Sequence, residues 1–97
     1  MRRKEKRSDF TKRVYEVVKR IPKGKTLTYR EVAKRAGKPF AWRAVGNILH
    51  KNKNLMVPCH RVIRSDKNIG GYKNGISQKI SLLRKEGIAI KKGKLIN

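Results

Sequence analysis

Apolar residues near the N-terminus recur at helical spacing. Between Asp9 and Pro22 the apolar positions are Phe10, Val14, Val17, Val18 and Ile21. Residues three and four apart lie on one face of a helix, so this spacing is typical of an amphipathic helix packed on a core. Proline has no N–H to donate and stops the pattern. The pattern predicts a first helix from Asp9 to Ile21.

The next segment predicts two shorter helices. Thr28, followed by Glu31 three residues later, matches a capping box and opens a helix that ends at Gly37. Pro39 is well placed as the first residue of a third helix, which runs to about Lys51. Two helices separated by a few residues, the second rich in basic groups, are typical of a helix-turn-helix.

The second half of the chain predicts less helix. Residues 55–63 are rich in Val and Ile but too short and proline-broken for a helix, which predicts short extended segments. Residues 66–74 contain a glycine pair and indicate a loop or wing, and a final helix is expected from Ile76 to Glu86. Alternating apolar and lysine residues over 88–96 predict a hairpin or strand. The expected fold class is mainly α, a winged helix-turn-helix-like domain of three to four helices with a small β-wing or hairpin.

Charge narrows the possible partners. The chain has 97 residues, with 28 Lys and Arg against 6 Asp and Glu, and a formal net charge of +22. This length allows one domain with a modest core. The excess positive charge implies phosphate contacts and salt-dependent affinity, so DNA is the first candidate partner. Residues 1–8 are expected to be a disordered basic arm and residues 9–97 the winged helix-like domain.

The rest of the composition indicates the setting of the protein. A polybasic membrane-surface protein needs bulky apolar anchors or a lipidation motif, and neither is present, so no membrane partner is expected. No apolar stretch resembles a signal peptide or approaches the roughly 20 residues that span a bilayer. The single cysteine cannot form an intramolecular disulfide, which indicates a reducing cytoplasm. One Cys and two His cannot complete a closed zinc site, so no metal and no cofactor is expected.

The cysteine lies in the motif Pro58-Cys59-His60-Arg61-Val62. The thiolate is the nucleophile, and neighbouring imidazole and guanidinium groups favour its negative charge. Adjacent side chains of an extended segment point to opposite faces, so a bridging water is the easier relay between Cys59 and His60. A basic histidine needs a third group to orient it, and Glu86 is the chosen carboxylate. The alternative is an inert buried thiol beside a structural histidine.

Two further motifs favour a functional cysteine. Thr26-Leu27-Thr28-Tyr29 places a phenol at the start of the second helix, and Arg43-Ala44-Val45-Gly46 places a guanidinium beside small residues on the third. Singly, Tyr29 fits a core tyrosine, Arg43 a solvated helix charge and Glu86 a helix-end carboxylate. Their order and spacing together favour a shared site.

In this combination the chain resembles the C-terminal DNA-binding and active-site domain of the O6-alkylguanine-DNA alkyltransferases. That family carries Pro-Cys-His-Arg-Val, a tyrosine followed by a short Ala-Gly helix, and Arg-Ala-Val-Gly, in the order found here. Matching runs also occur at Phe10-Thr11, Gly70-Gly71-Tyr72 and Leu82-Leu83-Arg84-Lys85-Glu86-Gly87. The resemblance covers roughly residues 9 to 87.

The resemblance implies a single-turnover reaction that consumes the protein. Cys59 is the expected acceptor, which takes the alkyl group from O6 of a flipped-out guanine, chiefly O6-methylguanine, and keeps it. His60, acting through a water, and Glu86 are the expected relay that deprotonates the thiol. Tyr29 is expected to donate a proton or hydrogen bond to guanine N3, where negative charge builds as the base leaves.

The resemblance also implies that a monomer binds double-stranded DNA through the minor groove. Arg43 resembles the finger that fills the space left by the flipped nucleotide. The hinge asparagine falls on Asn52 or Asn54, and Arg61 supports the segment structurally. Trp42 stands where the family commonly has a small residue, and its bulk predicts either a core contact or an altered fit to the groove, of which packing is favoured. The other expected DNA-contacting residues are Thr11, Ala41, Ala44 and Ser65.

The guanine pocket is expected to consist mainly of backbone groups. By resemblance, the carbonyls of Cys59 and Val62 face the exocyclic amine, and amides of Tyr72 and Lys73 face O6. Asn74 occupies a pocket-side position that the family often fills with glycine.

Two other functions stay open. An alkyltransferase-like sensor binds and flips the lesion without accepting the alkyl group, and such relatives typically have another residue, often Trp, in place of the nucleophile. A winged-helix architectural or transcription protein explains the charge and the helices but not the pairing of Cys59 with His60. The retained Cys59 favours transfer.

Overall fold

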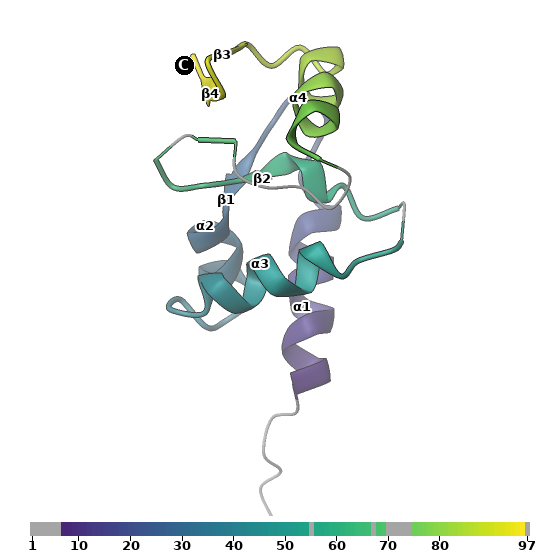
Figure 1. Cartoon of the computed structure of the whole chain (residues 1–97). Helices are drawn as coiled ribbons and strands as arrows, with labels where there is room; N and C mark the ends of the chain where they lie inside the picture. The colour runs from purple at the N-terminus through teal and green to yellow at the C-terminus, as the bar shows by residue number, and fades with distance from the viewer. Residues whose placement is uncertain (1–6, 55, 67, 70–74, 97) are drawn as a thin grey trace, which may run out of the picture.

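The computed structural model describes residues 7–54, 56–66, 68–69 and 75–96, and in this part of the chain it is mainly helical. This confirms the expected fold class. The elements follow one another as α1 (Arg7–Lys19), β1 (Leu27–Thr28), α2 (Tyr29–Arg35), α3 (Trp42–His50), the 3-10 turn η1 (Cys59–Arg61), β2 (Val62–Ile63), α4 (Ile76–Lys85), β3 (Ile90–Lys91) and β4 (Lys94–Leu95). Helices α1, α2 and α3 lie together at one end of the molecule, whereas α4 and the β3–β4 hairpin lie at the other (Figure 1).

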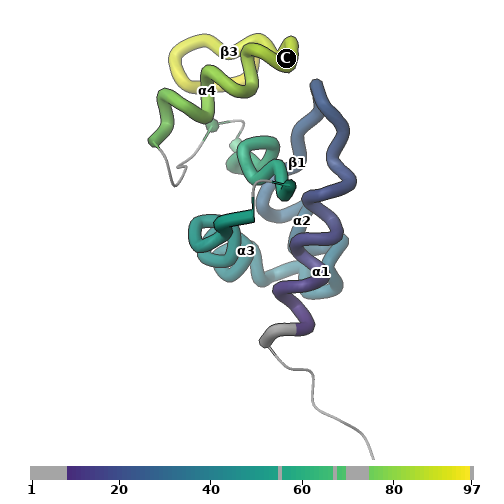
Figure 2. Tube along the Cα trace, turned by 90° about the vertical axis from the view of Figure 1, so that its right-hand side faces the viewer, coloured from purple at the N-terminus to yellow at the C-terminus, as the bar shows by residue number. Residues whose placement is uncertain are grey.

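Two clusters of buried apolar side chains correspond to these two ends. The larger cluster joins α1, α2 and α3, and it includes Cys59 and Val62. The smaller cluster consists of Ile63, Ile69, Leu83 and Ile90. Val62 and Ile63 are neighbours in β2, where successive side chains point to opposite faces. The strand that follows Cys59 therefore contributes to both clusters, and it lies between the two ends in the second view (Figure 2).

The short parallel pairing of β1 with β2 determines which residues meet at this junction. Leu27 pairs with Val62 and Thr28 with Ile63. Tyr29 comes directly after β1, and Cys59 precedes β2 by one 3-10 turn. The pairing thus brings the phenol and the thiol to the same region from positions 30 residues apart in the sequence.

The capping box that the sequence predicts for α2 is present. The Thr28 hydroxyl accepts a hydrogen bond from the Glu31 amide at 3.1 Å, and the Glu31 carboxylate accepts one from the Thr28 amide at 2.8 Å. Gly37 follows the helix with a φ of +93°, in the left-handed region expected for a residue that ends a helix. The hydrophobic pattern and the cap therefore predict both ends of α2 to within two residues.

Other predicted boundaries were wrong. The helix α1 begins at Arg7 and ends at Lys19, two residues earlier at each end than expected. The helix α3 begins at Trp42 rather than Pro39, because the Ala41 amide donates to the Lys38 carbonyl at 2.9 Å and closes a turn over the proline. Pro39 is thus a turn residue, which its fixed φ also suits.

The segment around the cysteine is not extended as predicted. Cys59–Arg61 forms a 3-10 turn, in which the Arg61 amide donates to the Pro58 carbonyl at 3.0 Å. Only Val62 and Ile63 of this stretch are a strand. Proline has no N–H to donate, but its carbonyl can accept a hydrogen bond. Pro58 can therefore begin a turn, which a prediction of extended structure overlooks.

The C-terminal hairpin is confirmed. Strands β3 and β4 pair antiparallel around Lys92 and Gly93, both with positive φ, as a two-residue hairpin turn requires. Asn68 bridges to Lys94, and the Ile69 amide donates to the Gly93 carbonyl, so residues 68–69 of the predicted wing dock on the hairpin. Residues 67 and 70–74 of that wing, and residues 1–6 of the predicted arm, lie outside the described residues. None of the described helices is long and apolar enough to cross a membrane.

Removing the cap of α2 tests the role of Thr28. Thr28→Ala is expected to lower the free energy of unfolding by about 1 kcal/mol, because the Glu31 amide loses its acceptor. For a domain of this size that corresponds to a fall of about 4–8 °C in the melting temperature, measured by circular dichroism. Thr26→Ala removes a nearby hydroxyl that caps neither neighbouring helix, and it is the matched control. Equal losses in both variants would contradict the assignment.

Candidate active site and nucleic-acid interface

Cys59 is a buried thiol, with 5% of its surface exposed. The side-chain amide of Asn52 lies 4.0 Å from the Cys59 sulfur. That same amide nitrogen donates to the Asn54 carbonyl at 3.1 Å, while the Asn54 amide donates to the Asn52 side-chain oxygen at 3.0 Å. Of the two asparagines considered as the hinge, Asn52 is therefore the one that touches the thiol. It follows α3 by two residues and so connects that helix to Cys59.

His60 and Arg61 both bind Glu86, which ends α4. The His60 Nε2 atom lies 3.0 Å from one Glu86 oxygen, and Arg61 makes a two-pronged contact of 2.9 and 2.6 Å. A third Arg61 nitrogen donates to the carbonyl of Ile21 at 2.8 Å. The hydrogen bonds from Arg61, and then those from His60, lower the pKa of Glu86 to about 2 although its burial opposes this. The carboxylate is thus ionised and holds the imidazole, as the relay requires.

Lys79 is a site residue that the sequence reasoning missed. Its side chain is fully buried, and its ammonium group donates to the Val62 carbonyl at 2.7 Å and lies 5.7 Å from the centre of the Tyr29 ring. Burial lowers its pKa to about 8, and the nearby Cys59 opposes this. The sequence carried one signal for this role, because Lys79 lies four residues before the buried Leu83 on the same face of α4. A charged residue at such a core position requires a partner.

Tyr29 completes this group at the first position of α2. Burial raises the pKa of Tyr29, and the negative charge of Cys59 raises it further, while Arg64 opposes the shift. The phenol therefore keeps its proton at neutral pH and can act as a donor. A thiol, a proton donor and a buried cation thus lie together, which is suited to a reaction that uses a sulfur nucleophile and develops negative charge on its substrate.

The carbonyls expected to read guanine already have one partner each. The Val62 amide donates to the Cys59 carbonyl, and Lys79 donates to the Val62 carbonyl. A carbonyl oxygen has two lone pairs and can accept more than one hydrogen bond. The other pocket residues predicted from the sequence, Tyr72, Lys73 and Asn74, lie outside the described residues.

The residues predicted to contact DNA lie on several elements around this site. Arg43 is exposed on α3, Ala41 and Ala44 are half-buried at its start, and Ser65 is exposed after β2. Thr11 on α1 and Ala44 line a hollow of about 360 Å³ between α1 and α3. The structure therefore brings Thr11 and Ala44 together and places Ser65 on a separate loop.

Trp42 has a packing role. It is half-buried against the larger cluster, and the Arg30 guanidinium lies 4.7 Å from the centre of its ring. Stacking of this kind holds an arginine in place at the surface. The bulk of Trp42 is thus accommodated on the core side of α3.

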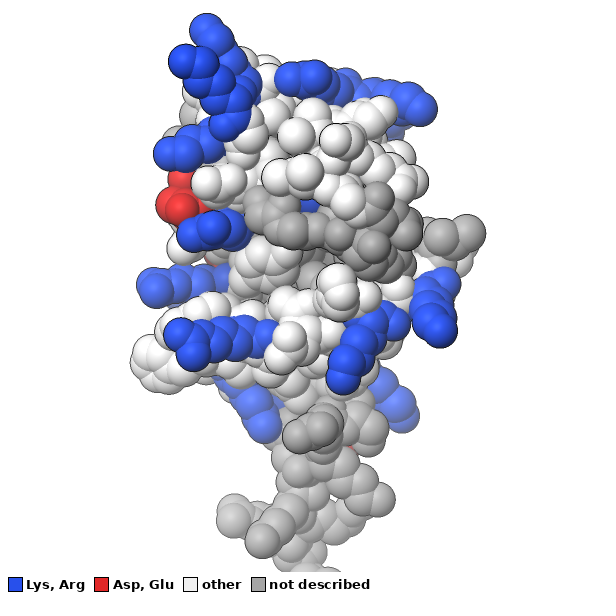
Figure 3. Space-filling model, in the orientation of Figure 1, with Lys and Arg blue, Asp and Glu red and all other residues white. Residues whose placement is uncertain are grey.

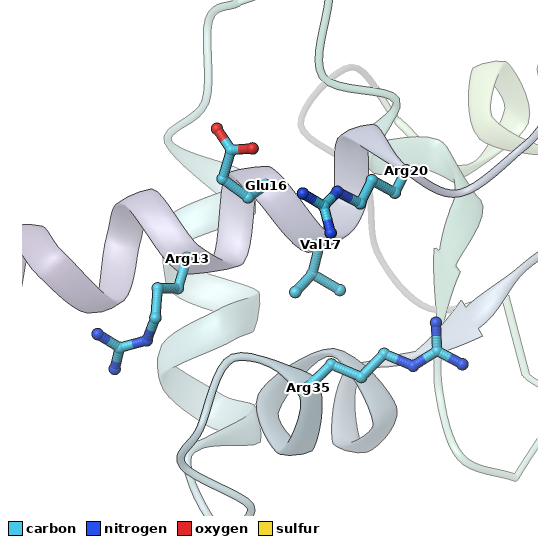
Figure 4. Close-up of a pocket in the computed structure, with 5 residues that line it drawn as sticks. All are labelled: Arg13, Glu16, Val17, Arg20 and Arg35. Atoms are coloured by element: carbon cyan, nitrogen blue, oxygen red, sulfur yellow. The ribbon is translucent and has the colours of Figure 1, made fainter.

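Positive charge is spread widely over the surface. Lys and Arg side chains extend along both edges of the face shown in Figure 3, on which acidic atoms are few. A second hollow, of about 290 Å³, lies between α1 and α2 and is lined by Arg13, Glu16, Val17, Arg20 and Arg35. Glu16 points away from α2, and Val17 lies between Arg20 of α1 and Arg35 of α2, with Arg13 extending away from it (Figure 4). None of the predicted site residues lines this hollow.

The family model for the DNA-binding domain of 6-O-methylguanine DNA methyltransferase matches residues 9–88. The chain belongs to this family. It is 48% identical over 84 residues to a methylated-DNA–protein-cysteine methyltransferase of Methanothermobacter thermautotrophicus, covering 86% of this chain and 47% of that protein. It is 42% identical over 78 residues to the bifunctional transcriptional activator and DNA repair enzyme Ada of Escherichia coli, covering 79% of this chain and 22% of Ada.

Solved structures of the family share the fold. The Mycobacterium tuberculosis OGT structure in complex with DNA has a TM-score of 0.78 at 42% identity, covering 81% of this chain and 49% of that one. The S. pombe Atl1 structure, in complex with damaged DNA containing O6-carboxymethylguanine, has a TM-score of 0.81 at 33% identity, covering 90% and 83%. This chain spans about half the length of the methyltransferases it matches, but most of Atl1.

The Glu86 network predicts a specific acid dependence of stability. Because the folded pKa of about 2 lies below the ordinary 4.5, the network stabilises the fold by roughly 3 kcal/mol above pH 4.5, and this is lost as the pH falls towards 2. Glu86→Gln is expected to lower the free energy of unfolding by a similar amount at pH 7, with the difference shrinking below pH 4.5. Urea denaturation across this range measures it.

Glu16→Gln is the matched control, because Glu16 is exposed on α1. It is expected to leave the unfolding free energy nearly unchanged at both pH values. A loss in Glu86→Gln that is equal at pH 7 and near pH 2 would contradict the stabilising role of the ionised carboxylate.

Lys79 predicts a dependence of the same sign in the alkaline range. Its folded pKa of about 8 lies below the ordinary 10.5, so above pH 8 the folded chain releases a proton that the unfolded chain retains. Stability is therefore expected to rise between pH 8 and about 9.5, below the range in which Tyr29 ionises, and Lys79→Met is expected to lack this rise. Lys85→Met, exposed on the same helix, is expected to follow the wild-type pH curve. Parallel curves for all three proteins would refute the assignment.

Proposed function

We propose that this chain repairs O6-alkylguanine, chiefly O6-methylguanine, by transferring the alkyl group irreversibly to Cys59. The observation that carries the proposal is the surrounding of Cys59 by Asn52, Tyr29 and Lys79, next to a His60 that is held by Glu86. The family names of the relatives support the same chemistry.

The reaction proceeds as a displacement at the alkyl carbon. The thiol proton leaves by way of His60, through a water, and Glu86 stabilises the resulting positive charge. The sulfur forms a bond to the alkyl carbon as the bond from that carbon to guanine O6 breaks, and the electron pair goes to the base. Tyr29 donates a hydrogen bond or its proton to guanine N3 as negative charge builds on the leaving base. The proton that His60 took from the thiol then replaces it, so that the thiol proton ends on the guanine. The product is an S-alkylcysteine and an unmodified guanine.

Lys79 is a positioning residue in this proposal. Its ammonium group holds the Val62 carbonyl and places positive charge near the sulfur, which favours the thiolate. Its lowered pKa reflects burial, so this cation is little screened by water.

Double-stranded DNA is the proposed partner, bound by a monomer in the cytoplasm. The charge of +22 supplies the attraction to phosphates. Helix α3 is proposed to enter the minor groove, where the small residues Ala41 and Ala44 permit close approach and Arg43 fills the space of the flipped nucleotide. Thr11 and Ser65 are proposed as phosphate contacts on either side, and Asn52 as the hinge.

A damage sensor is the second candidate. Similarity to S. pombe Atl1 over 90% of this chain and 83% of that one favours it, since that protein was crystallised with damaged DNA. The retained Cys59 in a built environment favours transfer over sensing alone.

One experiment separates transfer from sensing. The protein is incubated with a duplex containing O6-methylguanine, and its intact mass is measured. Transfer predicts a gain of one methyl group per chain that maps to Cys59 and is absent in Cys59→Ser and with undamaged duplex. Tight lesion-selective binding without a mass change would favour the sensor. Binding that ignores the lesion would indicate an architectural protein and overturn both.

A further inference from the structure

Phe40 is the most exposed large apolar side chain among the described residues, with 86% of its surface accessible. It lies in the turn between α2 and α3, directly before Ala41, the residue that caps α3. A phenylalanine in this position can instead be buried by a contact with the helix that follows it. An apolar residue just before a helix cap commonly packs on the fourth helical residue and fixes the entry of the chain.

That local contact is absent here. The fourth residue of α3 is Val45, which is fully buried in the larger cluster, whereas Phe40 stays in solvent. The structure therefore leaves an aromatic ring exposed directly before the start of α3. Leaving such a ring in water forgoes stabilisation that burial of its apolar surface would give.

The surroundings of Phe40 are basic and belong to the proposed DNA-binding face. Arg43 and Asn47 are exposed at positions three and seven residues further along, which continues one side of α3. Asn47 lines the hollow between α1 and α3, and Lys38 lies two residues before Phe40. A large ring among cations suits a partner that has both phosphates and flat apolar surfaces, which describes nucleic-acid bases on their backbone.

We propose that Phe40 stacks against a base of bound DNA, at an opened base step. This step lies about one turn of the protein helix from the Arg43 contact. The inference rests on the proposed DNA function and adds to it a contact that carries no charge. Because every base has a flat apolar face, this contact contributes affinity with little sequence preference. It favours duplexes whose stacking is already disturbed, since less stacking has to be broken.

The salt dependence of duplex binding distinguishes a stacking contact from a charged contact. Phe40→Ala is expected to weaken duplex binding by about tenfold, as removal of one stacking contact does. The slope of log K against log salt is expected to stay that of the wild type, because no phosphate contact is lost. Arg43→Ala is expected to reduce that slope, because it removes a positive charge from the DNA-binding face. Ile96→Ala, exposed at the opposite end of the molecule, is the matched control and is expected to bind as the wild type does.

Fluorescence tests the contact directly. In Phe40→Trp, the introduced indole is expected to be quenched on duplex binding beyond the change seen for Trp42 in the wild type. Ile96→Trp is expected to show no added quenching. The inference is overturned if Phe40→Ala binds duplex with wild-type affinity and the emission of Phe40→Trp is not quenched by DNA. It is also overturned if the indole of Phe40→Trp is quenched in the absence of DNA, by a second copy of the chain or by a contaminating protein.

The outcomes also separate this inference from the proposed function. If the wild type binds duplex but forms no methyl adduct, transfer is wrong and the Phe40 contact is judged on its own variants. If the wild type binds no duplex at all, both are wrong. Circular dichroism melting of the variants shows that each remains folded, which the exposure of Phe40 favours.

Discussion

The carboxylate of Glu86 is the interaction on which the arrangement of the site depends. It receives hydrogen bonds from His60 and Arg61, and Arg61 continues to the Ile21 carbonyl beyond the end of α1. One ionised group thus ties the last helix, the cysteine segment and the first helix together. Removing a charge from water is costly, and the low pKa of Glu86 indicates that its partners more than offset that cost.

This tie matters because the cysteine segment lies between two separate apolar clusters. Cys59 and Val62 pack in the larger cluster and Ile63 in the smaller one, so the segment is held by both. The pairing of β1 with β2 adds only two residues on each strand. A short sheet is a weak support by itself, which makes the charged network and the buried Lys79 the more important restraints.

The parts of the structure set by local chemistry could be predicted from the sequence. The Thr28 cap depends on residues three apart, and the hairpin at Lys92-Gly93 depends on its turn. The choice of Glu86 as the partner of His60 came from the scarcity of acids and from family resemblance, and the 3.0 Å contact agrees with it. Lys79 was missed because a pattern of apolar positions treats every lysine as solvated. The turn at Cys59 was missed because residue preference says little about three residues after a proline.

Asn52 gives the site a mechanical link to α3. The helix ends at His50, and two residues later the Asn52 amide meets both the Asn54 carbonyl and the Cys59 sulfur. A buried amide with fixed partners cannot rotate freely, because losing either hydrogen bond leaves a polar group unsatisfied. One side chain therefore joins the segment after α3 to the thiol. Arg43 is exposed near the other end of the same helix, so its nine residues lie between this exposed guanidinium and the contact of Asn52 with the sulfur.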